Sequence, residues 1–592
     1  MLLHYVLGLW KHLSRRRRVQ FYALIVLMIL ASVAEVASIG LIVPFLGALT
    51  APDQILSNST LRAVADRWSI TTSSDLVLLM GVAFCGAALV AGAIRLLLLY
   101  ATTKFSFALG ADLSLEVYRR TLYQPYSVHL ERNSSEVING IIVKTATIIS
   151  SVLVPLLTII TSAVLLVGIL AALLAIDPII AVSSIMVVGL LYWIVLRITR
   201  ESMRRDSEII ARESSKVVQA LQEGLGGIRD VLLDSTQELC SRIYQASDRP
   251  LRLAQGRQII ATGSPRFLIE AFGMVVIAIL AVWITQRSNG GEAAVPLLGA
   301  LALGAQRLLP IVQQGYSSLS TIRGAEASLR DMMALLGQTI DTGATVPAAR
   351  LPFNRTMVLR EIDFTYGRGG PQVLRKLNLT IPRGSRIGIF GQTGGGKSTL
   401  LDIMMGLLRP TSGQLVVDDT PIDQTNQRGW QLHIAHVPQS IYLSDNSITE
   451  NIAFGVSRDK IDIKRVLDAA RRAQMHDVIT SWPEQYDTFV GERGVRLSGG
   501  QRQRIGVARA LYKQADVIIL DEATSALDDE TERNLMDSIE GLGEDITLII
   551  VAHRLSTLRN CHFVAEVMAG GIKEFGSYED IIAPRLQLQS LP

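Results

Sequence analysis

A loop rich in glycine that ends in a lysine and a serine contains the residue types best suited to bind phosphate. It follows a strand-like run at residues 386–390 and precedes a helical run at 399–408, the strand–loop–helix arrangement that such a site requires. Glycines let backbone N–H groups curve around phosphate oxygens, Lys397 can neutralise the β- and γ-phosphates, and the Ser398 hydroxyl can bind Mg²⁺. The predicted phosphate-binding residues are Gly391, Thr393, Gly394, Gly395, Gly396, Lys397, Ser398 and Thr399. An ordinary glycine-rich turn would predict neither the lysine nor the helix.

Two carboxylates follow a second buried run further along the chain. Residues 517–520 are all apolar and end in Asp521 and Glu522, as in a parallel strand that carries acids to the nucleotide edge of a sheet. Asp521 is predicted to hold the Mg²⁺ shell and Glu522 to polarise the attacking water. Two acids after a strand are often only a helix cap, so this interpretation depends on the other motifs.

The composition indicates that part of the chain lies in lipid. A chain of 592 residues with 19% charged residues and a mean hydropathy of +0.34 is too long for one ordinary core and too apolar for an all-soluble protein. The net charge of +4 gives no case for a nucleic-acid partner. Three cysteines far apart in the sequence indicate neither a disulfide framework nor a metal site.

Six apolar segments before residue 320 are long enough to cross a bilayer, which takes about 20 helical residues. They are residues 21–46, 76–100, 148–176, 178–196, 267–286 and 293–311. Basic residues gather on one side of these spans, most densely at residues 15–18, and predict that both termini are cytoplasmic. An apolar stripe at helical spacing over residues 61–68 predicts a short amphipathic helix at the outer surface, although a solvated loop explains the stripe nearly as well.

The segments between the spans predict how the rest of the chain is organised. Residues 101–147 and 197–266 are charged and keep helical periodicity, so the membrane helices should continue into the cytoplasm and turn back at breaks near 124–126 and 224–227. From about Pro352 the pattern changes to short β-rich runs and soluble helices, which is typical of an α/β domain. We therefore expect an all-α six-helix transmembrane domain at residues 1–336, a linker at 337–352 and an α/β nucleotide-binding domain at 353–592.

Shortly before the acidic strand stands the sequence Leu497-Ser498-Gly499-Gly500-Gln501. This is the signature of ABC ATPases, and the whole domain resembles that family. The resemblance implies ATP and Mg²⁺ as cofactors. It also implies that the signature residues Ser498, Gly499, Gly500 and Gln501 cover an ATP held by the loop of another subunit. A chain with one intact set of motifs is therefore expected to work as a homodimer.

Further residues gain a role through this resemblance. Tyr366 should stack on adenine, and Gln439 should touch Mg²⁺ and the attacking water. Asp528 lies in the D-loop, and His553 should contact the γ-phosphate. An aromatic face suits a base, an amide suits water, and an imidazole can donate to phosphate. The candidate catalytic residues are therefore Glu522, His553 and Gln439, and the candidate metal ligands are Ser398, Gln439 and Asp521.

The six spans ahead of the ATPase domain resemble the exporter class of ABC proteins, the type IV architecture. A finer likeness is to the PglK-type lipid-linked oligosaccharide flippases. It rests on four short motifs: Ala34-Glu35-Val36 with Pro44, Asn133-Ser134-Ser135-Glu136, Ser264-Pro265-Arg266 with Glu270, and Gln306-Arg307-Leu308-Leu309-Pro310. This likeness implies ATP-driven export or flipping of a lipid-linked saccharide or a similar anionic glycolipid by alternating access, in a bacterial inner membrane. A broad lipid or multidrug exporter has the same ATPase and similar helices, and it is the alternative.

Three arginines, Arg95, Arg266 and Arg307, fall within or beside the second, fifth and sixth spans, where a charge is costly. All three should lie in the cytoplasmic half of the membrane, where their planar forks suit the phosphate of an anionic lipid head. Alternatively, they pair with Glu35 and Glu270 in the same region, or extend to the membrane surface. The sequence leaves both interpretations open.

Other classes of ABC protein fit the sequence less well. A gated channel or regulatory subunit is disfavoured because Glu522 and His553 are both present. The six spans exclude a soluble ABC ATPase of DNA repair or translation. Importers usually keep the membrane and ATPase parts on separate chains, so export is the expected direction.

Overall fold

The computed structural model describes residues 2–50, 73–176, 178–287, 294–340, 348–367, 369–523, 527–541, 545–552 and 554–585. The chain divides into two compact units. The first comprises residues 1–124 and 131–339, and the second comprises residues 125–130 and 340–592. The outer helix predicted at residues 61–68 lies outside the described residues.

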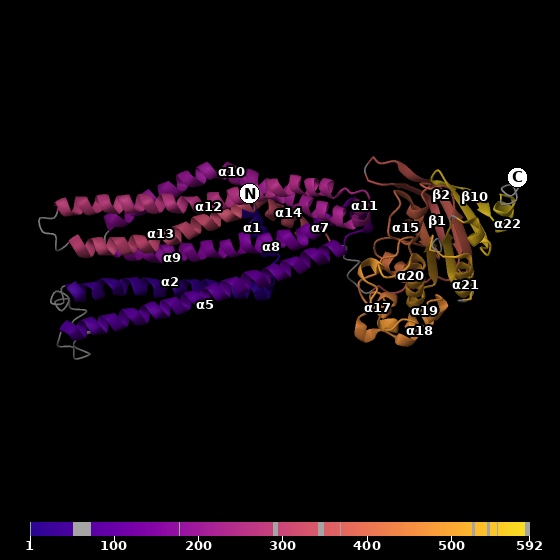
Figure 1. The fold of residues 1–592 in the computed structure, drawn as a ribbon, viewed down its shortest axis with the longest axis horizontal. Helices are drawn as coiled ribbons and strands as arrows, with labels where there is room; N and C mark the ends of the chain where they lie inside the picture. The colour runs from indigo at the N-terminus through magenta and orange to yellow at the C-terminus, as the bar shows by residue number, and fades with distance from the viewer. Residues whose placement is uncertain are drawn as a thin grey trace. The chain divides into compact units, whose positions relative to one another are not determined.

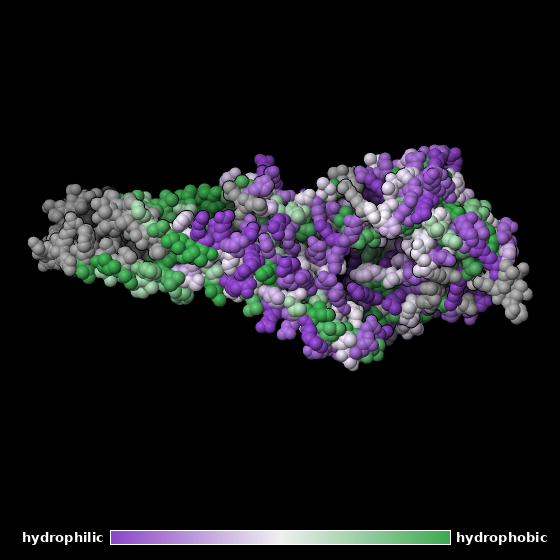
Figure 2. Space-filling model, turned by 90° about the horizontal axis from the view of Figure 1, so that it is seen from above, coloured by the Kyte–Doolittle hydropathy of each residue, from purple (hydrophilic) through white to green (hydrophobic). Residues whose placement is uncertain are grey.

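Long helices make up most of the first unit (Figure 1). They are α2 (Arg15–Thr50), α5 (Ser73–Leu122), α9 (Val154–Ile176), α10 (Pro178–Gly226), α12 (Gln237–Arg287) and α13 (Ala294–Gly324). Each contains most or all of one of the predicted spans. Among the described residues, three helical segments are long and apolar enough to cross a membrane: Arg15–Ser38, Val77–Leu122 and Ser134–Ala171. The surface of this unit changes along the helices from largely hydrophobic to largely hydrophilic (Figure 2).

The long helices continue beyond the membrane spans, as the sequence predicts. α5 has 50 residues and α12 has 51, more than twice the length that a bilayer requires. α5 ends at Leu122, just before Pro125, which removes a backbone N–H and disfavours a helical conformation of the residue before it. The short helix α6 (Tyr126–Glu131) follows. α10 ends at Gly226, and α11 (Ile228–Leu233) follows, so both predicted breaks are confirmed.

Several elements of the first unit were not predicted from the sequence. α1 (Leu2–Lys11) precedes the arginine run. α7 (Ser134–Asn139) and α8 (Thr145–Ile148) alternate with two π-helical turns, η1 (Gly140–Lys144) and η2 (Ile149–Leu153). Lys144 is buried and donates from Nζ to Asp331 Oδ2 at 2.6 Å in α14 (Glu326–Leu336). This ion pair joins the start of the third span to the helix that follows the sixth.

Two sheets form the framework of the second unit. An antiparallel sheet has the order β2-β1-β4-β5, with β1 (Thr356–Thr365), β2 (Gln372–Pro382), β4 (Ser412–Val417) and β5 (Thr420–Pro421). The larger sheet has the order β10-β9-β3-β8-β7-β6, with β3 (Arg386–Phe390), β6 (Ile434–Val437), β7 (Val517–Asp521), β8 (Thr547–Val551), β9 (Phe563–Met568) and β10 (Gly571–Gly576). All neighbouring pairs in this larger sheet are parallel except β10 with β9. The sequence had predicted an α/β domain but not the separate antiparallel sheet.

Strand β7 of the larger sheet is buried on both faces. Along β7, Ile518 and Leu520 belong to one buried cluster, whereas Val517 and Ile519 belong to another. This alternation explains why residues 517–520 are all apolar.

The helices of the second unit are α15 (Lys397–Met404), α16 (Gln427–Gln431), α17 (Ile448–Ile452), α18 (Ile463–Arg472), α19 (His476–Thr480), α20 (Gly499–Lys513), α21 (Asp529–Glu540) and α22 (Tyr578–Ile581). Short 3₁₀ turns are η4 (Arg458–Lys460), η5 (Gln485–Asp487), η6 (Glu492–Gly494) and η7 (Leu555–Leu558).

Candidate functional site

The glycine-rich loop joins β3 to α15 through backbone conformations that favour glycine. Gly391, Gly394 and Gly396 have φ angles of +144°, +80° and +97°, which L side chains rarely adopt. A Cβ on Gly391 would lie 2.1 Å from the carbonyl oxygen of Val567, whereas one on Gly394 would meet nothing within 4 Å. Gly391 is therefore required both by its backbone angle and by the close approach of β9. Gly394 is required only by its angle.

Lys397 places its charge inside the curve of this loop. Its Nζ donates to the carbonyl oxygens of Gly391 at 2.8 Å and Gln392 at 3.0 Å. The same residue begins α15, so the unpaired N–H groups of the first helical turn lie beside the ammonium group. Backbone donors, the positive end of a helix and a lysine together favour a phosphate group.

Tyr366 and Thr399 are brought together as parts of one site. The Tyr366 hydroxyl shares a 2.8 Å hydrogen bond with Thr399 Oγ1 in the first turn of α15. The Tyr366 ring packs edge-on against Phe364, with ring centroids 4.8 Å apart and an interplanar angle of 87°. Because 39% of Tyr366 remains exposed, the ring can offer a face to a nucleotide base.

The acidic edge lies at the carboxyl end of β7, which is parallel to β6. Asp521 is the last residue of β7, and Glu522 has a left-handed φ of +50° with its backbone N–H bonded to the carbonyl oxygen of Val551 at 3.0 Å. Such a backbone is costly for a residue other than glycine, and such conformations cluster at functional sites. Gln439, two residues beyond β6, donates from Nε2 to Glu522 Oε2. The structure thus brings these two predicted residues together.

The residues predicted to bind Mg²⁺ offer one hydroxyl, one carboxylate and one amide, from Ser398, Asp521 and Gln439. Oxygen ligands of this kind suit Mg²⁺. Because the Gln439 amide nitrogen is used by Glu522, the amide oxygen is the atom directed elsewhere and suited to a cation or water. The donor set therefore fits the predicted ion.

Asp402 is a further acidic residue that the sequence analysis missed. Burial and the neighbouring charge of Asp521 raise the pKa of Asp402 to about 6. A signal was present in the sequence, because Asp402 follows Ser398 by four residues on α15 and so lies on the same helix face. This position places a carboxyl group with a raised pKa near Asp521, one of the predicted Mg²⁺ ligands.

The signature and D-loop residues are organised as helix caps. Ser498 Oγ accepts from Gln501 N at 3.2 Å, and Gln501 Oε1 accepts from Ser498 N at 2.9 Å, which makes a capping box at the start of α20. Asp528 caps α21 by accepting from Thr531 N at 2.9 Å, and hydrogen bonds from Thr531 lower the pKa of Asp528. Gly499 and Gly500 form the first turn of α20. Across the described residues, no hydrogen bond joins the signature to the phosphate-binding loop. His553 lies outside the described residues.

Two of the three arginines predicted in the membrane region form ion pairs. Arg95 in α5 pairs with Glu35 in α2, and Glu35 is 2% exposed. Arg266 Nε lies 3.0 Å from Glu270 Oε1, one turn further along α12. Arg307 belongs to α13, but its side chain lies outside the described part of the structure. The pairing anticipated as an alternative is therefore present for Arg95 and Arg266.

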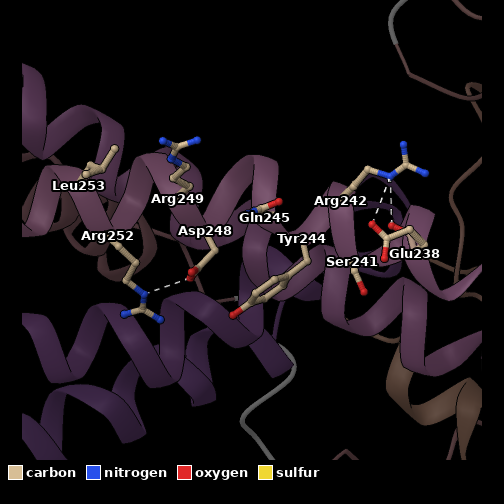
Figure 3. Close-up of a pocket in the computed structure, with 9 residues that line it drawn as sticks. All are labelled: Glu238, Ser241, Arg242, Tyr244, Gln245, Asp248, Arg249, Arg252 and Leu253. Carbon is tan, nitrogen blue, oxygen red and sulfur yellow. Dashed lines mark hydrogen bonds and ion pairs between the residues drawn. The ribbon is translucent and has the colours of Figure 1, made fainter.

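A shallow pocket along α12 adds charged residues that the sequence had not singled out (Figure 3). Its lining includes Arg242, which lies 3.7 Å from Glu238, and Arg252, which lies 3.1 Å from Asp248. Each of these arginines is thus neutralised by an acid four residues earlier on the same helix. We assign this pocket no part in the nucleotide site.

Known proteins resemble this chain over both units. Residues 374–525 match the family model of the ABC transporter, and residues 21–306 match that of the ABC transporter transmembrane region. The ATP-dependent lipid A-core flippase of Chromohalobacter salexigens is 32% identical over 407 residues, which cover 67% of this chain and 68% of the relative. The protein of the same name from Burkholderia orbicola is 28% identical over 512 residues, covering 85% and 84%. A solved bacterial Atm1-family ABC exporter with ATP bound has a TM-score of 0.80 at 23% identity over 97% of this chain and 99% of its own, which shows a shared fold.

Proposed function

This chain belongs to the ABC transporters, and from that premise we propose that it flips or exports an anionic glycolipid, with a lipid-linked saccharide as the leading candidate. Transport coupled to ATP hydrolysis is common to the family and to the flippases that it matches. The name of those relatives gives lipid A-core as the molecule that they flip, and this supports a lipid substrate. The proposal extends to alternating access in a homodimer.

In this proposal each residue of the nucleotide site has a separate role. Tyr366 binds the base, and the loop with Lys397 binds the phosphates. Ser398, Asp521 and Gln439 hold Mg²⁺, which would neutralise phosphate charge when bound. Glu522 polarises the attacking water, and the hydrogen bond from Gln439 orients its carboxylate. His553 contacts the γ-phosphate in this proposal.

The homodimer is proposed because the signature and the phosphate-binding loop must both face one ATP. One chain contains one set of each. The signature begins α20, whose first-turn N–H groups can bind the γ-phosphate of an ATP held by the partner. We also propose that the transporter lies in a bacterial inner membrane, with the ATPase unit and both termini in the cytoplasm.

The substrate proposal rests on one observation. The side chain of Arg266 is still exposed although it forms an ion pair with Glu270. The Nε contact to Glu270 leaves 56% of the Arg266 side chain exposed. A guanidinium group has five N–H donors, and a second, bidentate contact to a phosphate is compatible with one carboxylate contact. Arg95 also keeps 45% of its side chain exposed. These groups can therefore meet an anionic head group in the cytoplasmic half of the membrane.

The ion pairs also give weight to the alternative, a broad lipid or multidrug exporter. If Glu35 and Glu270 neutralise the arginines, a cavity nearby has little net charge, and a neutral amphipathic substrate is accepted as well. Reconstitution in liposomes separates the two functions. We expect flipping and ATPase stimulation by an anionic lipid-linked saccharide, and none by neutral drugs or by phosphatidylethanolamine. Equal stimulation by all three would favour the broad exporter.

A further inference from the structure

The loop that follows Gln439, residues 440–447, packs closely against the middle of α20. A Cβ on Gly506 would lie 2.2 Å from Ile441 Cδ1 and 3.1 Å from Ile441 Cγ1. Glycine is unfavourable inside a helix because it loses much conformational freedom there, so its presence in α20 needs a structural reason. The close approach of Ile441 provides one. We call residues 440–447 the Gln439 loop.

Arg509, one turn further along α20, holds the same loop by hydrogen bonds. Its Nη1 donates to the carbonyl oxygen of Tyr442 at 3.1 Å, and its Nε donates to that of Asn451 at 3.0 Å. Its Cζ also lies 4.5 Å from the centroid of the Phe454 ring. These acceptors are uncharged, and burial lowers the pKa of Arg509. The half-buried guanidinium group therefore depends on the loop for its hydrogen bonds.

Asn451 and Leu443 extend this attachment, and both are 0% exposed. Asn451 Oδ1 accepts from Ser444 N at 3.0 Å and from Arg509 Nη2 at 3.4 Å. A Cβ on Gly494, just before the signature, would lie 2.8 Å from Leu443 Cδ1. The Gln439 loop is therefore held both by α20 and by the turn that precedes it.

Helix α20 thus connects the signature to the Gln439 loop. Ser498 of the signature caps α20, and Arg509 follows about three helical turns later. Because a helix moves as a rigid element, a shift at its first turn is carried to the groups attached further along. We propose that Arg509 is a positioning residue for Gln439. By holding the Gln439 loop on α20, it sets where the Gln439 amide meets Glu522, and it makes that contact depend on the helix that begins with the signature.

This inference rests on the roles proposed above for Gln439 and for the signature in a homodimer. In that arrangement the signature covers the ATP of the partner, whereas Gln439 serves the ATP held by its own chain. Both are attached to α20, so the two ATP sites share one rigid element. The nucleotide at one site therefore influences the catalytic amide at the other.

ATP hydrolysis by the full-length protein in detergent, without lipid substrate, tests the role of Arg509. The variant Arg509→Lys keeps the charge, but a single ammonium group cannot reproduce the contacts of the planar fork. A small displacement of a catalytic group is costly, so kcat should fall by about 10- to 100-fold. The KM for ATP should stay near the parental value, because Tyr366 and Lys397 still bind the nucleotide.

The variant Gln439→Ala shows whether Arg509 acts through Gln439. In the Gln439→Ala background, Arg509→Lys should have little further effect on kcat, because the amide to be positioned is already absent. A fall by the same factor in both backgrounds would mean that Arg509 acts independently, and it would overturn the proposal. A parental kcat in Gln439→Ala alone would refute the proposed role of Gln439 itself, and the positioning role with it.

The matched control is Arg504→Lys. Arg504 lies on the same helix and donates from Nη1 to the carbonyl oxygen of Gln474 at 2.7 Å, away from the Gln439 loop. This variant should keep the parental kcat. An equal fall in Arg504→Lys and Arg509→Lys would assign the effect to damage of α20 and overturn the proposal.

Hydrogen–deuterium exchange without nucleotide gives a readout that does not depend on catalysis. Protection of the Ser444 amide should fall in Arg509→Lys and stay parental in Arg504→Lys. A lower kcat with unchanged protection would show that the loop has not moved, and it would contradict the positioning role.

Should Arg509→Lys fail to fold, the variant Gly506→Val decides. Valine suits a helix better than glycine does, but its side chain needs the space that Ile441 occupies. We expect a lower kcat that again disappears in the Gln439→Ala background. A parental kcat in Gly506→Val would refute the proposal.

Discussion

The two units of this transporter hold their functional side chains in different ways. In the nucleotide-binding unit the backbone positions them. Gly391 packs closely against the backbone of β9, Glu522 has a left-handed φ of +50°, and Ser498 caps α20. In the transmembrane unit, carboxylates position the charged groups, as Glu35 does for Arg95. Backbone conformations leave a strict sequence motif, whereas an ion pair between helices does not. The nucleotide chemistry is therefore more predictable from sequence than the substrate.

The variant Glu522→Gln tests the nucleotide-binding unit, in which backbone conformations position the functional side chains. It should have the largest effect of the variants considered. The amide keeps the size of the side chain but cannot polarise water, so the ATPase rate should fall by about 10² to 10⁴ while ATP still binds. Phosphate release and nucleotide trapping measure the two properties. Glu579→Gln, at an exposed position in α22, is the control and should keep the parental rate. A parental rate in Glu522→Gln would assign the role to another residue.

The variant Arg95→Ala tests the transmembrane unit, in which ion pairs position the charged groups. Glu35 is 2% exposed, and removing the arginine partner of a buried carboxylate should cost about 3 to 5 kcal/mol of stability. Thermal unfolding in detergent and folded yield measure this loss, and Arg95→Ala with Glu35→Gln should recover most of it. Arg204→Ala, which removes an exposed pair with Glu201, serves as the control. Normal stability with loss of flipping would instead assign Arg95 to substrate binding.

The variants Gly391→Ala and Gly394→Ala separate the cost of a strained backbone from the cost of a steric clash within the glycine-rich loop. Both glycines have positive φ angles, but only a Cβ on Gly391 would collide with the backbone of β9. Overpacking of this kind should cost about 1 to 3 kcal/mol more at Gly391 than the strain alone costs at Gly394. Denaturant unfolding and ATP affinity measure the difference, and equal losses would show that β9 moves aside.

Arg266→Ala should have the smallest effect on stability. Its pair with Glu270 is partly exposed and lies within one helix, an arrangement that contributes about 0.3 to 0.5 kcal/mol. The unfolding temperature should therefore be close to that of the parent. Flipping of an anionic lipid-linked saccharide should nevertheless fall if the guanidinium binds the head group. Unchanged flipping would remove Arg266 from the substrate site.

The sequence predicted those parts of the fold that depend on periodicity and turn residues. The long helices, the break at Pro125 and the fully apolar strand β7 all leave local patterns. The π-helical turns on either side of Thr145 leave no such pattern. Neither does the ion pair of Lys144 with Asp331, because the two residues lie 187 positions apart in the sequence. The spacing of Asp402 four residues after Ser398 is a local signal, but its raised pKa is not, since that arises from burial and from Asp521 on a different element.

The nucleotide-binding unit is discontinuous along the chain, because residues 125–130 group with residues 340–592. Burial and the neighbouring Asp402 and Tyr366 raise the pKa of Tyr126 within this short segment. The ribosome makes the segment long before the rest of the unit. An ATPase fragment expressed from residue 340 onwards would lack it and would leave the surface around Asp402 and Tyr366 uncovered. The order of synthesis therefore requires the transmembrane helices between the two pieces to be made before the nucleotide-binding unit can be completed.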